Sequence, residues 1–232
     1  MKSISITAFN RPRYLKRVLQ SLSLNNLKGY DKIYCGIEPG NDEVFEICRK
    51  IDFIEPVIIL NETVIGIRRN PYELLNRLFE EGSEFNVYLE DDSELSPDAI
   101  ELANYHYNNF KNDEYFCCCF HNYQSSKEHK SKLIEKQEFW AIGFSLFATA
   151  WKKWYKSYWF DDHIAKEFNV GGIGWDWSIR ASILKHKKQV LTPMFSRSMH
   201  IGRVGIHSSH EQYINQFSGK PYCKSKIGNF HK

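Results

Sequence analysis

The sequence predicts an α/β fold, in which a mostly parallel sheet is covered by helices on both faces. Short apolar segments typical of buried strands alternate with segments whose apolar residues recur at helical spacing, which indicates parallel strands joined by crossover helices. A chain of 232 residues, of which 42% are apolar, can bury one sizeable core. We therefore expect a single domain that spans residues 1–232.

The first hundred residues contain four predicted strands, at 3–9, 32–37, 57–60 and 85–89. A helix is expected to begin at Pro12, and it has one apolar face because its apolar residues recur with helical spacing: Leu15, Val18, Leu19 and Leu22. Two more helices are expected at 44–51 and 72–79, the second of them after a turn at 66–70. Strands and helices therefore alternate throughout this half of the chain.

The second half of the sequence is less regular. Its expected strands lie at 116–121, 190–191 and 195–200, and its expected helices lie at 148–155 and from residue 175 onward. Three further segments are rich in polar residues or glycine, and we expect a loop, a linker and a lid at 125–137, 169–174 and 201–210.

Three of the six cysteines are adjacent: Cys117, Cys118 and Cys119. In a strand, Cys118 points away from its two neighbours, so this spacing does not suit a metal site. Phe116 and Phe120 flank the three and indicate a buried strand in which cysteine acts as a small apolar residue. Reduced thiols of this kind favour a cytoplasmic location.

The most informative stretch ends the fourth predicted strand with three carboxylates in a row, Glu90, Asp91 and Asp92. Ser96 and Pro97 follow, and they predict a helix that begins near Pro97. Three adjacent acids repel one another unless a hard cation lies among them, and carboxylate oxygens suit Mg²⁺ or Mn²⁺. The alternative is an acidic turn that is merely solvated.

Ligands of parallel α/β sheets bind beyond the carboxyl ends of the strands. The turn that carries Arg11, the loop that carries Glu38 and the acidic triplet all follow predicted strands, so we expect them to face one crevice. The first turn lacks the Gly-x-Gly-x-x-Gly pattern, which argues against a dinucleotide-binding domain.

Composition excludes several classes of function. The net charge is only +3 and the basic residues are spread along the chain, so there is no nucleic-acid signature. No signal peptide is evident, and no apolar run is long enough for a transmembrane segment. Aromatic residues make up 15% of the chain and suit either stacking on sugars or packing in the core.

Several motifs, in order along the chain, resemble those of the inverting N-acetylglucosaminyltransferase I family, which has the GT-A (Rossmann-like) glycosyltransferase fold. The resemblance runs from about residue 4 to about residue 213, and the segments that carry it are Ala8-Phe-Asn-Arg11, Glu90-Asp-Asp-Ser-Glu-Leu-Ser-Pro-Asp98, Trp140-Ala-Ile-Gly-Phe144, Trp175-Asp-Trp177 and Ser196-Arg-Ser-Met-His-Ile-Gly-Arg-Val-Gly-Ile-His207. The sequence departs from the family at Asn10, where the family has an acid, and at Glu38, where it has Asp. It also lacks one acid of the family's Trp-Asp-Asp-Trp and the membrane anchor of the Golgi enzymes.

The resemblance implies a role for each candidate residue. Asp92 would hold Mn²⁺ or Mg²⁺, with His207 or His200 as an additional ligand, and Asp176 would be the catalytic base. The remaining candidates would bind the nucleotide-sugar: Glu90 and Asp91 the ribose and donor sugar, Arg11 and Glu38 the uridine side, Arg197 and Arg203 the diphosphate, and Trp175 a sugar face. Each also has a plain structural interpretation, such as a helix N-terminal Asp for Asp176, a surface charge for Arg11 or a core aromatic for Trp175.

The function implied by the resemblance is inverting, metal-dependent transfer of GlcNAc from UDP-GlcNAc to a hydroxyl of a carbohydrate acceptor. Residues 1–100 would bind the UDP-sugar donor, and residues 101–232 would bind the acceptor and carry the lid. The alternatives are a transferase that uses UDP-Gal or UDP-Glc, a sugar nucleotidyltransferase, or a carbohydrate-binding protein without catalysis. A nucleotidyltransferase normally has a Gly-rich loop after the first strand, which this chain lacks.

Overall fold

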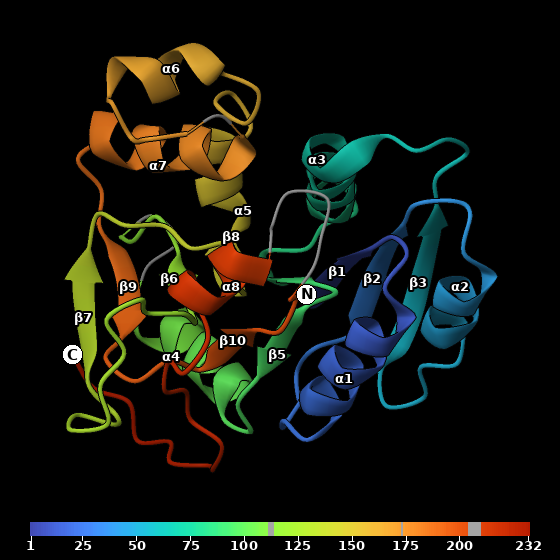
Figure 1. Cartoon of the computed structure of the whole chain (residues 1–232), viewed down its shortest axis with the longest axis horizontal. Helices are drawn as coiled ribbons and strands as arrows, with labels where there is room; N and C mark the ends of the chain where they lie inside the picture. Colours follow the sequence, from blue (N-terminus) through green and yellow to red (C-terminus); the bar gives the residue numbers. More distant parts are fainter. Residues whose placement is uncertain (111–113, 173, 204–209) are drawn as a thin grey trace.

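The computed structural model describes residues 1–110, 114–172, 174–203 and 210–232. The chain folds around an eight-stranded sheet with the strand order β3-β2-β1-β4-β8-β6-β9-β7 (Figure 1). Helices lie on both faces of this sheet, so the α/β prediction is confirmed.

The first half of the chain forms the regular, parallel part of the sheet. Its strands are β1 (Lys2–Ala8), β2 (Lys32–Ile37), β3 (Glu55–Leu60) and β4 (Phe85–Glu90). They are joined by α1 (Pro12–Ser23), α2 (Asp42–Arg49) and α3 (Gly66–Glu80). The strand β1 pairs in parallel with β2 on one side and β4 on the other, so the carboxyl ends of these strands share one edge.

The second half completes the sheet with mostly antiparallel pairs. Its strands are β6 (Cys118–Cys119), β7 (Leu133–Lys136), β8 (Phe144–Phe147) and β9 (Val190–Pro193). The strand β8 runs antiparallel to β4 and β6, whereas β6 and β9 are parallel. The second half also contributes α4 (Ala99–Asn109), α5 (Ala148–Ala150), the π-helical turn η1 (Trp151–Tyr155), α6 (Asp162–Glu167), α7 (Trp175–Lys185) and α8 (His210–Gln216).

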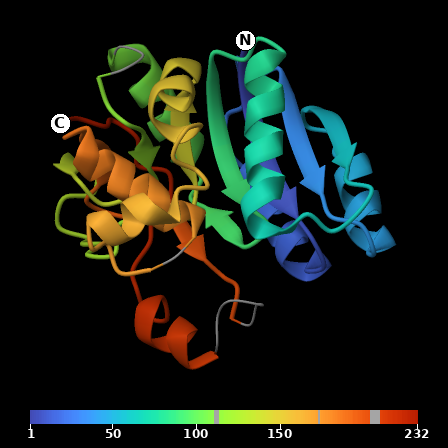
Figure 2. The same ribbon diagram turned by 90° about the horizontal axis from the view of Figure 1, so that it is seen from above.

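Two hydrophobic clusters lie on opposite faces of the sheet, as the alternation of side chains along a strand requires. In β4, Val87 and Leu89 pack into the cluster that contains residues of α1, α2 and α4. Tyr88, which lies between them, packs into the cluster that contains residues of α3, η1 and α7. Seen from above, α3 therefore lies on the opposite face of the sheet from α1 (Figure 2).

A separate two-stranded ribbon lies beside the acidic triplet. It pairs β5 (Ser93–Leu95) antiparallel with β10 (Ser198–His200), so that His200 lies opposite Ser93. Residues that are more than a hundred positions apart in the chain thus meet next to Asp92. The sequence did not predict β5.

Two boundaries differ from the prediction. The expected turn at 66–70 is the beginning of α3, because the Glu38 carboxylate accepts hydrogen bonds from the backbone N–H groups of Ile65 and Gly66 at this helix end. The helix expected to begin near Pro97 begins at Ala99, and the Ser96 hydroxyl donates to the Cys223 carbonyl instead of capping the helix.

The expected loop at 125–137 is partly a strand, because its last residues form β7 and pair with β9 at the edge of the sheet. All six cysteines are buried and free, and for Cys117, Cys118 and Cys119 this agrees with their prediction as small apolar residues. None of the described helices is both long and apolar enough to cross a membrane.

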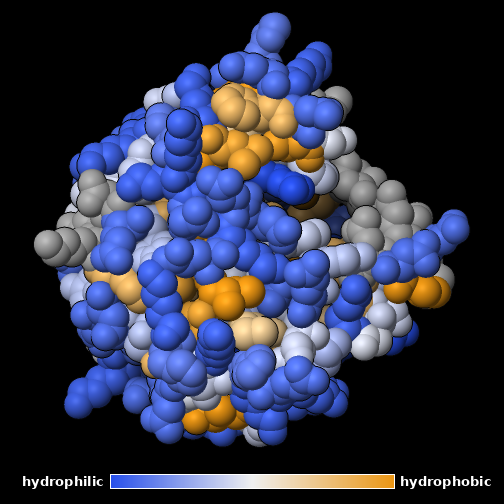
Figure 3. All heavy atoms as spheres, turned by 90° about the vertical axis from the view of Figure 1, so that its left-hand side faces the viewer, coloured by the Kyte–Doolittle hydropathy of each residue, from blue (hydrophilic) through white to orange (hydrophobic). Residues whose placement is uncertain are grey.

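The face at the left of Figure 1 is mostly hydrophilic and carries only separate, small apolar patches (Figure 3).

Candidate active site

The candidate active site lies at the edge where β1, β2 and β4 end. Thr7 of β1 is paired with Glu90 of β4, and Ala8 is paired with Ile37 of β2, so the residues that follow these strands are neighbours. The structure therefore places Arg11, Glu38 and the acidic triplet at one edge of the sheet, as the sequence predicts.

Arg11 lies between two buried carboxylates. Its guanidinium forms ion pairs with Asp91 and Asp92, whose side chains are only 4% and 3% exposed. Burial raises the pKa of the Asp91 carboxyl to about 6, although the neighbouring Arg11 charge acts in the opposite direction. The Arg11 side chain remains partly exposed, so this cation can contact both the acids and a ligand in the solvent.

His200 is the third side chain that approaches Asp92. Its Nε2 lies 3.3 Å from the Oδ2 of Asp92, and it reaches this position because β10 pairs with β5 directly after the acidic triplet. Burial lowers the pKa of His200, with the Asp92 charge opposing, so the ring favours its neutral form, in which a nitrogen can bind a metal.

Unsatisfied buried atoms of these residues could serve as ligands of a divalent cation. Asp91 Oδ2 and Asp92 Oδ1 are buried and have no hydrogen-bond partner in the described part of the chain, and the nitrogen of His200 that faces Asp92 is Nε2. Oxygen and imidazole ligands suit Mn²⁺, and oxygen suits Mg²⁺. No group of three or more His, Cys, Asp or Glu side chains in the described residues forms a complete metal site. The donor set therefore fits an ion that completes its coordination with ligand oxygens and water.

Gly202 lets the chain approach Asp92 closely. A Cβ atom at this position would lie 2.4 Å from the Oδ2 of Asp92 and 3.1 Å from a terminal nitrogen of Arg11. The backbone N–H of Ile201 also donates to the Asp92 carbonyl over 2.9 Å. Any larger residue than glycine at 202 would therefore push against the carboxylate and its cation.

Asp176 lies at the first turn of α7, as expected. Gly174 precedes it with φ of +149°, a conformation open to glycine, and a Cβ atom there would lie 2.8 Å from an oxygen of Asp176. Burial raises the pKa of the Asp176 carboxyl, while nearby backbone N–H groups and the Arg68 charge act in the opposite direction. Burial raises the pKa of Glu90, and the negative charges of Asp92, Asp91 and, least of the three, Asp176 act in the same direction.

Arg68 was not identified from the sequence. It is the third residue of α3, and its side chain extends to the second half of the chain. There it pairs with Asp162 at 2.8 Å and donates to the Trp159 carbonyl. The Trp159 indole donates back to the Arg68 carbonyl. Because the segment 66–70 was predicted to be a turn, no pattern in the sequence indicated that Arg68 reaches Asp162.

Glu38 lies at the same edge but bonds to the start of α3, and three further predicted residues lie elsewhere. Glu38 is buried, and both of its oxygens accept backbone hydrogen bonds at the start of α3. Arg197 is fully buried, where it pairs with Asp98 at 2.8 Å and donates to the carbonyls of Phe195 and Lys130. Trp175 is buried in the core and stacks on Trp159 with ring centroids 4.3 Å apart. Arg203 lines a groove beside α1, and His207 is outside the described residues.

No family model and no curated protein sequence matches the chain. Solved structures, in contrast, do match the chain. The chain is similar to the glycosyltransferase GlyE of Streptococcus pneumoniae, with a TM-score of 0.54 and 15% identity over 82% of this chain and 44% of that one. It is also similar to residues 1–349 of S. aureus TarS in complex with UDP-GlcNAc, with a TM-score of 0.60 and 12% identity over 89% of this chain and 60% of that one.

A third similar structure is the mannosyltransferase PcManGT of Pyrobaculum calidifontis in complex with GDP-Man and Mn²⁺, with a TM-score of 0.51 and 10% identity over 83% of this chain and 54% of that one. The chain has a glycosyltransferase fold. It spans between 44% and 60% of the length of these three proteins. At such low identity the comparisons establish the fold, and the particular resemblance to the N-acetylglucosaminyltransferase I family remains a prediction.

Proposed function

We propose that the protein is a metal-dependent, inverting glycosyltransferase that moves a sugar, in the first instance GlcNAc from UDP-GlcNAc, to a hydroxyl group of a carbohydrate acceptor. The observation that carries this proposal is the pair of buried carboxylates, Asp91 and Asp92, whose unsatisfied oxygens lie at the carboxyl edge of the parallel strands. A site of this kind binds a cation together with an anionic ligand.

On the donor side, Asp92 and His200 would hold Mn²⁺ or Mg²⁺. When bound, the ion would supply charge stabilisation for the leaving diphosphate. Arg11 lies between the acids and solvent, so its guanidinium can pair with a phosphate oxygen as well. Burial and the Asp92 charge raise the pKa of Glu90, and a protonated Glu90 can donate a hydrogen bond to a hydroxyl group of the donor.

On the acceptor side, Asp176 would take the proton of the attacking hydroxyl. The acceptor oxygen forms a bond with the anomeric carbon, the bond from that carbon to the diphosphate breaks, and the diphosphate leaves with the electron pair. The raised pKa of Asp176 makes it a stronger base than an exposed aspartate once it is deprotonated. One displacement inverts the anomeric centre, so an α-linked donor gives a β-linked product.

The replacement Asp176→Asn tests this assignment, because it keeps the shape of the side chain and removes the base. We expect transfer to fall by roughly a hundredfold to ten-thousandfold, with donor affinity unchanged. Transfer by the unaltered protein should rise with pH through the raised pKa of Asp176 and then level off. NMR spectroscopy of the product, with UDP-GlcNAc, UDP-Glc, UDP-Gal and GDP-Man as donors, measures both the rate and the anomeric configuration.

Glu167→Gln is a matched control, since Glu167 is an exposed acid at the end of α6 in the same half of the chain. It should retain most of the transfer rate. Full activity of the Asp176→Asn protein, or an α-linked product from an α-linked donor, would show that the base or the stereochemistry is assigned incorrectly.

A further inference from the structure

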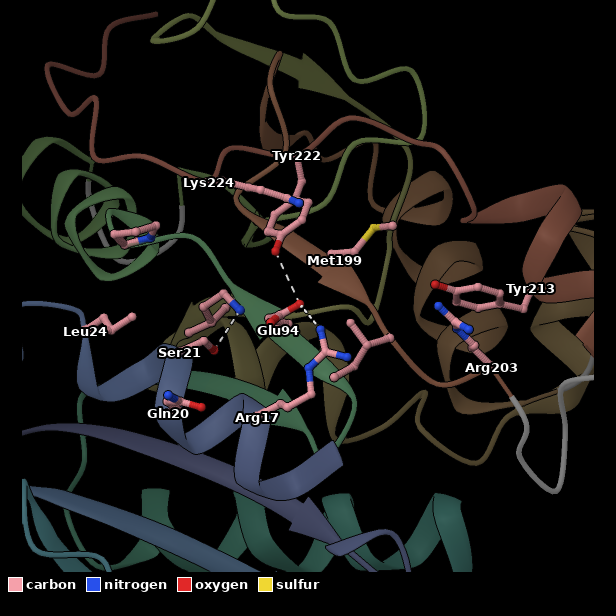
Figure 4. Close-up of a pocket in the computed structure, with 13 residues that line it drawn as sticks. Arg17, Gln20, Ser21, Leu24, Glu94, Met199, Arg203, Tyr213, Tyr222 and Lys224 are labelled. Atoms are coloured by element: carbon pink, nitrogen blue, oxygen red, sulfur yellow. Dashed lines mark hydrogen bonds and ion pairs between the residues drawn. The ribbon is translucent and has the colours of Figure 1, made fainter. Parts of the chain in front are cut away.

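A groove outside the acidic edge remains unexplained by the proposed reaction. It has a volume of about 520 Å³, within the range of small-molecule sites. One wall is α1 with Arg17, Gln20 and Leu24, and the other is formed by Tyr213, Tyr222 and Lys224 near the end of the chain (Figure 4). The ribbon of β5 and β10 forms its floor with Glu94 and Met199.

The β5–β10 ribbon separates this groove from the candidate active site. Met199 is paired with Glu94, and both line the groove. The next residue along β10, His200, approaches Asp92 instead. Because successive residues of a strand point to opposite faces, the groove lies behind the ribbon as seen from the acidic triplet.

The charges that line the groove favour an anion. Arg17, Arg203 and Lys224 are cationic, whereas Glu94 is the only acidic residue among the described lining residues. Glu94 accepts from Arg17 at 2.8 Å and from the Tyr222 hydroxyl at 3.3 Å, so it neutralises one cation and leaves two (Figure 4). Those two cations are available to bind phosphate or carboxylate oxygens.

The uncharged residues of the groove suit a sugar ring. Tyr213, Tyr222 and Gln20 offer hydroxyl and amide groups that can bond to sugar hydroxyls. Leu24, Met199 and Ile201 offer apolar surface for the C–H face of a ring. The Tyr222 hydroxyl donates its proton to Glu94, so toward a sugar hydroxyl it can act as an acceptor.

The wall that carries Tyr222 is firmly attached to the protein body. Ser196 and Tyr222 form an isolated parallel bridge, and the backbone N–H of Cys223 donates to the Ser196 carbonyl at 2.9 Å. The Ser96 hydroxyl donates to the Cys223 carbonyl, and the buried thiol of Cys223 bonds to the Ser225 carbonyl. This wall of the groove is therefore preformed, which reduces the entropic cost of binding a ligand.

We propose that this groove is a second binding site, separate from the donor site, for a saccharide that carries a phosphate or carboxylate group. The anionic group contacts Lys224, and the sugar ring lies against Tyr222, which is next to Lys224, while Arg203 lies at the other end of the groove (Figure 4). The segment that follows β10 joins the two sites, because Ile201 and Gly202 contact Asp92 while Arg203 lines the groove.

The test is a titration with glucose 6-phosphate and with glucuronate, followed by NMR spectroscopy of the full chain, with glucose and inorganic phosphate as comparison ligands. We expect the two anionic sugars to bind more tightly than glucose or phosphate. Their relative affinity distinguishes a phosphate-bearing from a carboxylate-bearing ligand. Lys224→Ala should weaken binding about tenfold, the effect of losing one charge-assisted hydrogen bond.

Lys226→Ala is the matched control, because Lys226 is two residues away but pairs with Glu101 outside the groove. It should bind the anionic sugars like the unaltered protein. The proposal is wrong if no anionic sugar binds, if glucose or phosphate binds as tightly, or if both lysine variants behave alike. It is also wrong if UDP displaces the sugar, since the sugar then occupies the donor site.

Discussion

A terminal nitrogen of Arg11 lies 2.5 Å from the Oδ2 of Asp92. The same guanidinium pairs with Asp91, so one partly exposed cation balances two buried carboxylates. In the proposed reaction, Asp92 binds a metal ion and Arg11 contacts the donor diphosphate. Arg11 therefore supplies the positive charge that the acids need when neither metal nor donor is bound.

The variant Arg11→Ala should be less stable than the unaltered protein, because it leaves two buried carboxylates without a cation. We expect a loss of roughly 3 kcal/mol or less in the free energy of unfolding, since Arg11 is not fully buried. Mn²⁺ should restore part of this loss by replacing the missing charge. Urea unfolding in EDTA and in Mn²⁺ measures both effects, with Arg13→Ala, an exposed neighbour, as the control. Equal stability of Arg11→Ala and Arg13→Ala in EDTA would contradict this account.

Glu38→Gln should destabilise the protein by about 1 kcal/mol, because a side-chain amide can accept only one of the two hydrogen bonds from Ile65 and Gly66. The measurement is the free energy of unfolding, compared with that of Glu62→Gln, an exposed glutamate in the loop that precedes α3. UDP affinity should change little. If stability is unchanged and UDP affinity falls, Glu38 contacts the nucleotide and its contribution to α3 is minor.

Gly202→Ala should weaken metal-dependent UDP binding. The added Cβ atom would lie 2.4 Å from the Oδ2 of Asp92 and would displace that carboxylate. Gly40→Ala is the contrasting control, because Gly40 has φ of +98° and has no atom within 4 Å of the added Cβ. That variant should lose stability through backbone strain and keep its UDP affinity. Unchanged UDP affinity in Gly202→Ala would mean that the close approach at residue 202 has no part in binding.

His106 should make the protein less stable as the pH falls below neutrality. It is fully buried on α4 beside Phe85 and Phe147, and burial lowers its pKa to about 3. Between this value and the ordinary value near 6.5, the unfolded chain binds a proton that the folded chain does not, so stability decreases with decreasing pH. The contribution of His106 is roughly 2 kcal/mol between pH 7 and pH 5.

The carboxylates with a raised pKa, Glu90, Asp91 and Asp176, act in the opposite sense, because the folded protein binds their protons first. The test is therefore the difference between the unaltered protein and His106→Asn, whose side chain does not titrate. Unfolding free energies from pH 5 to pH 7 should decrease more steeply with acidity in the unaltered protein. Parallel curves for the two proteins would show that His106 titrates normally.

Local sequence patterns predicted the strands and helices that depend on the residues of a single segment. The apolar run before Glu90 and the helical spacing of Leu15, Val18 and Leu22 are properties of single segments, and both elements were located correctly. Because parallel strands end at a common edge, these predictions also placed Arg11 next to the acidic triplet.

The features that local patterns did not indicate concern pairs of residues that are distant in the sequence. Arg197 was expected to bind a diphosphate, yet it is buried against Asp98, and no local pattern links residues so far apart. The approach of His200 to Asp92 depends on β5, a strand of only three residues that forms because β10 lies beside it. Arg68 reaches Asp162 from α3, which begins at Gly66, within the segment that was predicted to be a turn.

Calorimetric titration of the protein with UDP, in Mn²⁺ and in EDTA, is the most direct test of the claim that the acidic edge binds a metal and a nucleotide-sugar. We expect one UDP per chain in Mn²⁺, and at least about tenfold weaker binding in EDTA or in the Asp92→Asn protein, since each loses the cation that offsets the diphosphate charge. Asp42→Asn, which alters the first turn of α2, should bind as the unaltered protein does. Equal affinity in Mn²⁺ and EDTA, or in the Asp92→Asn protein, would contradict the account.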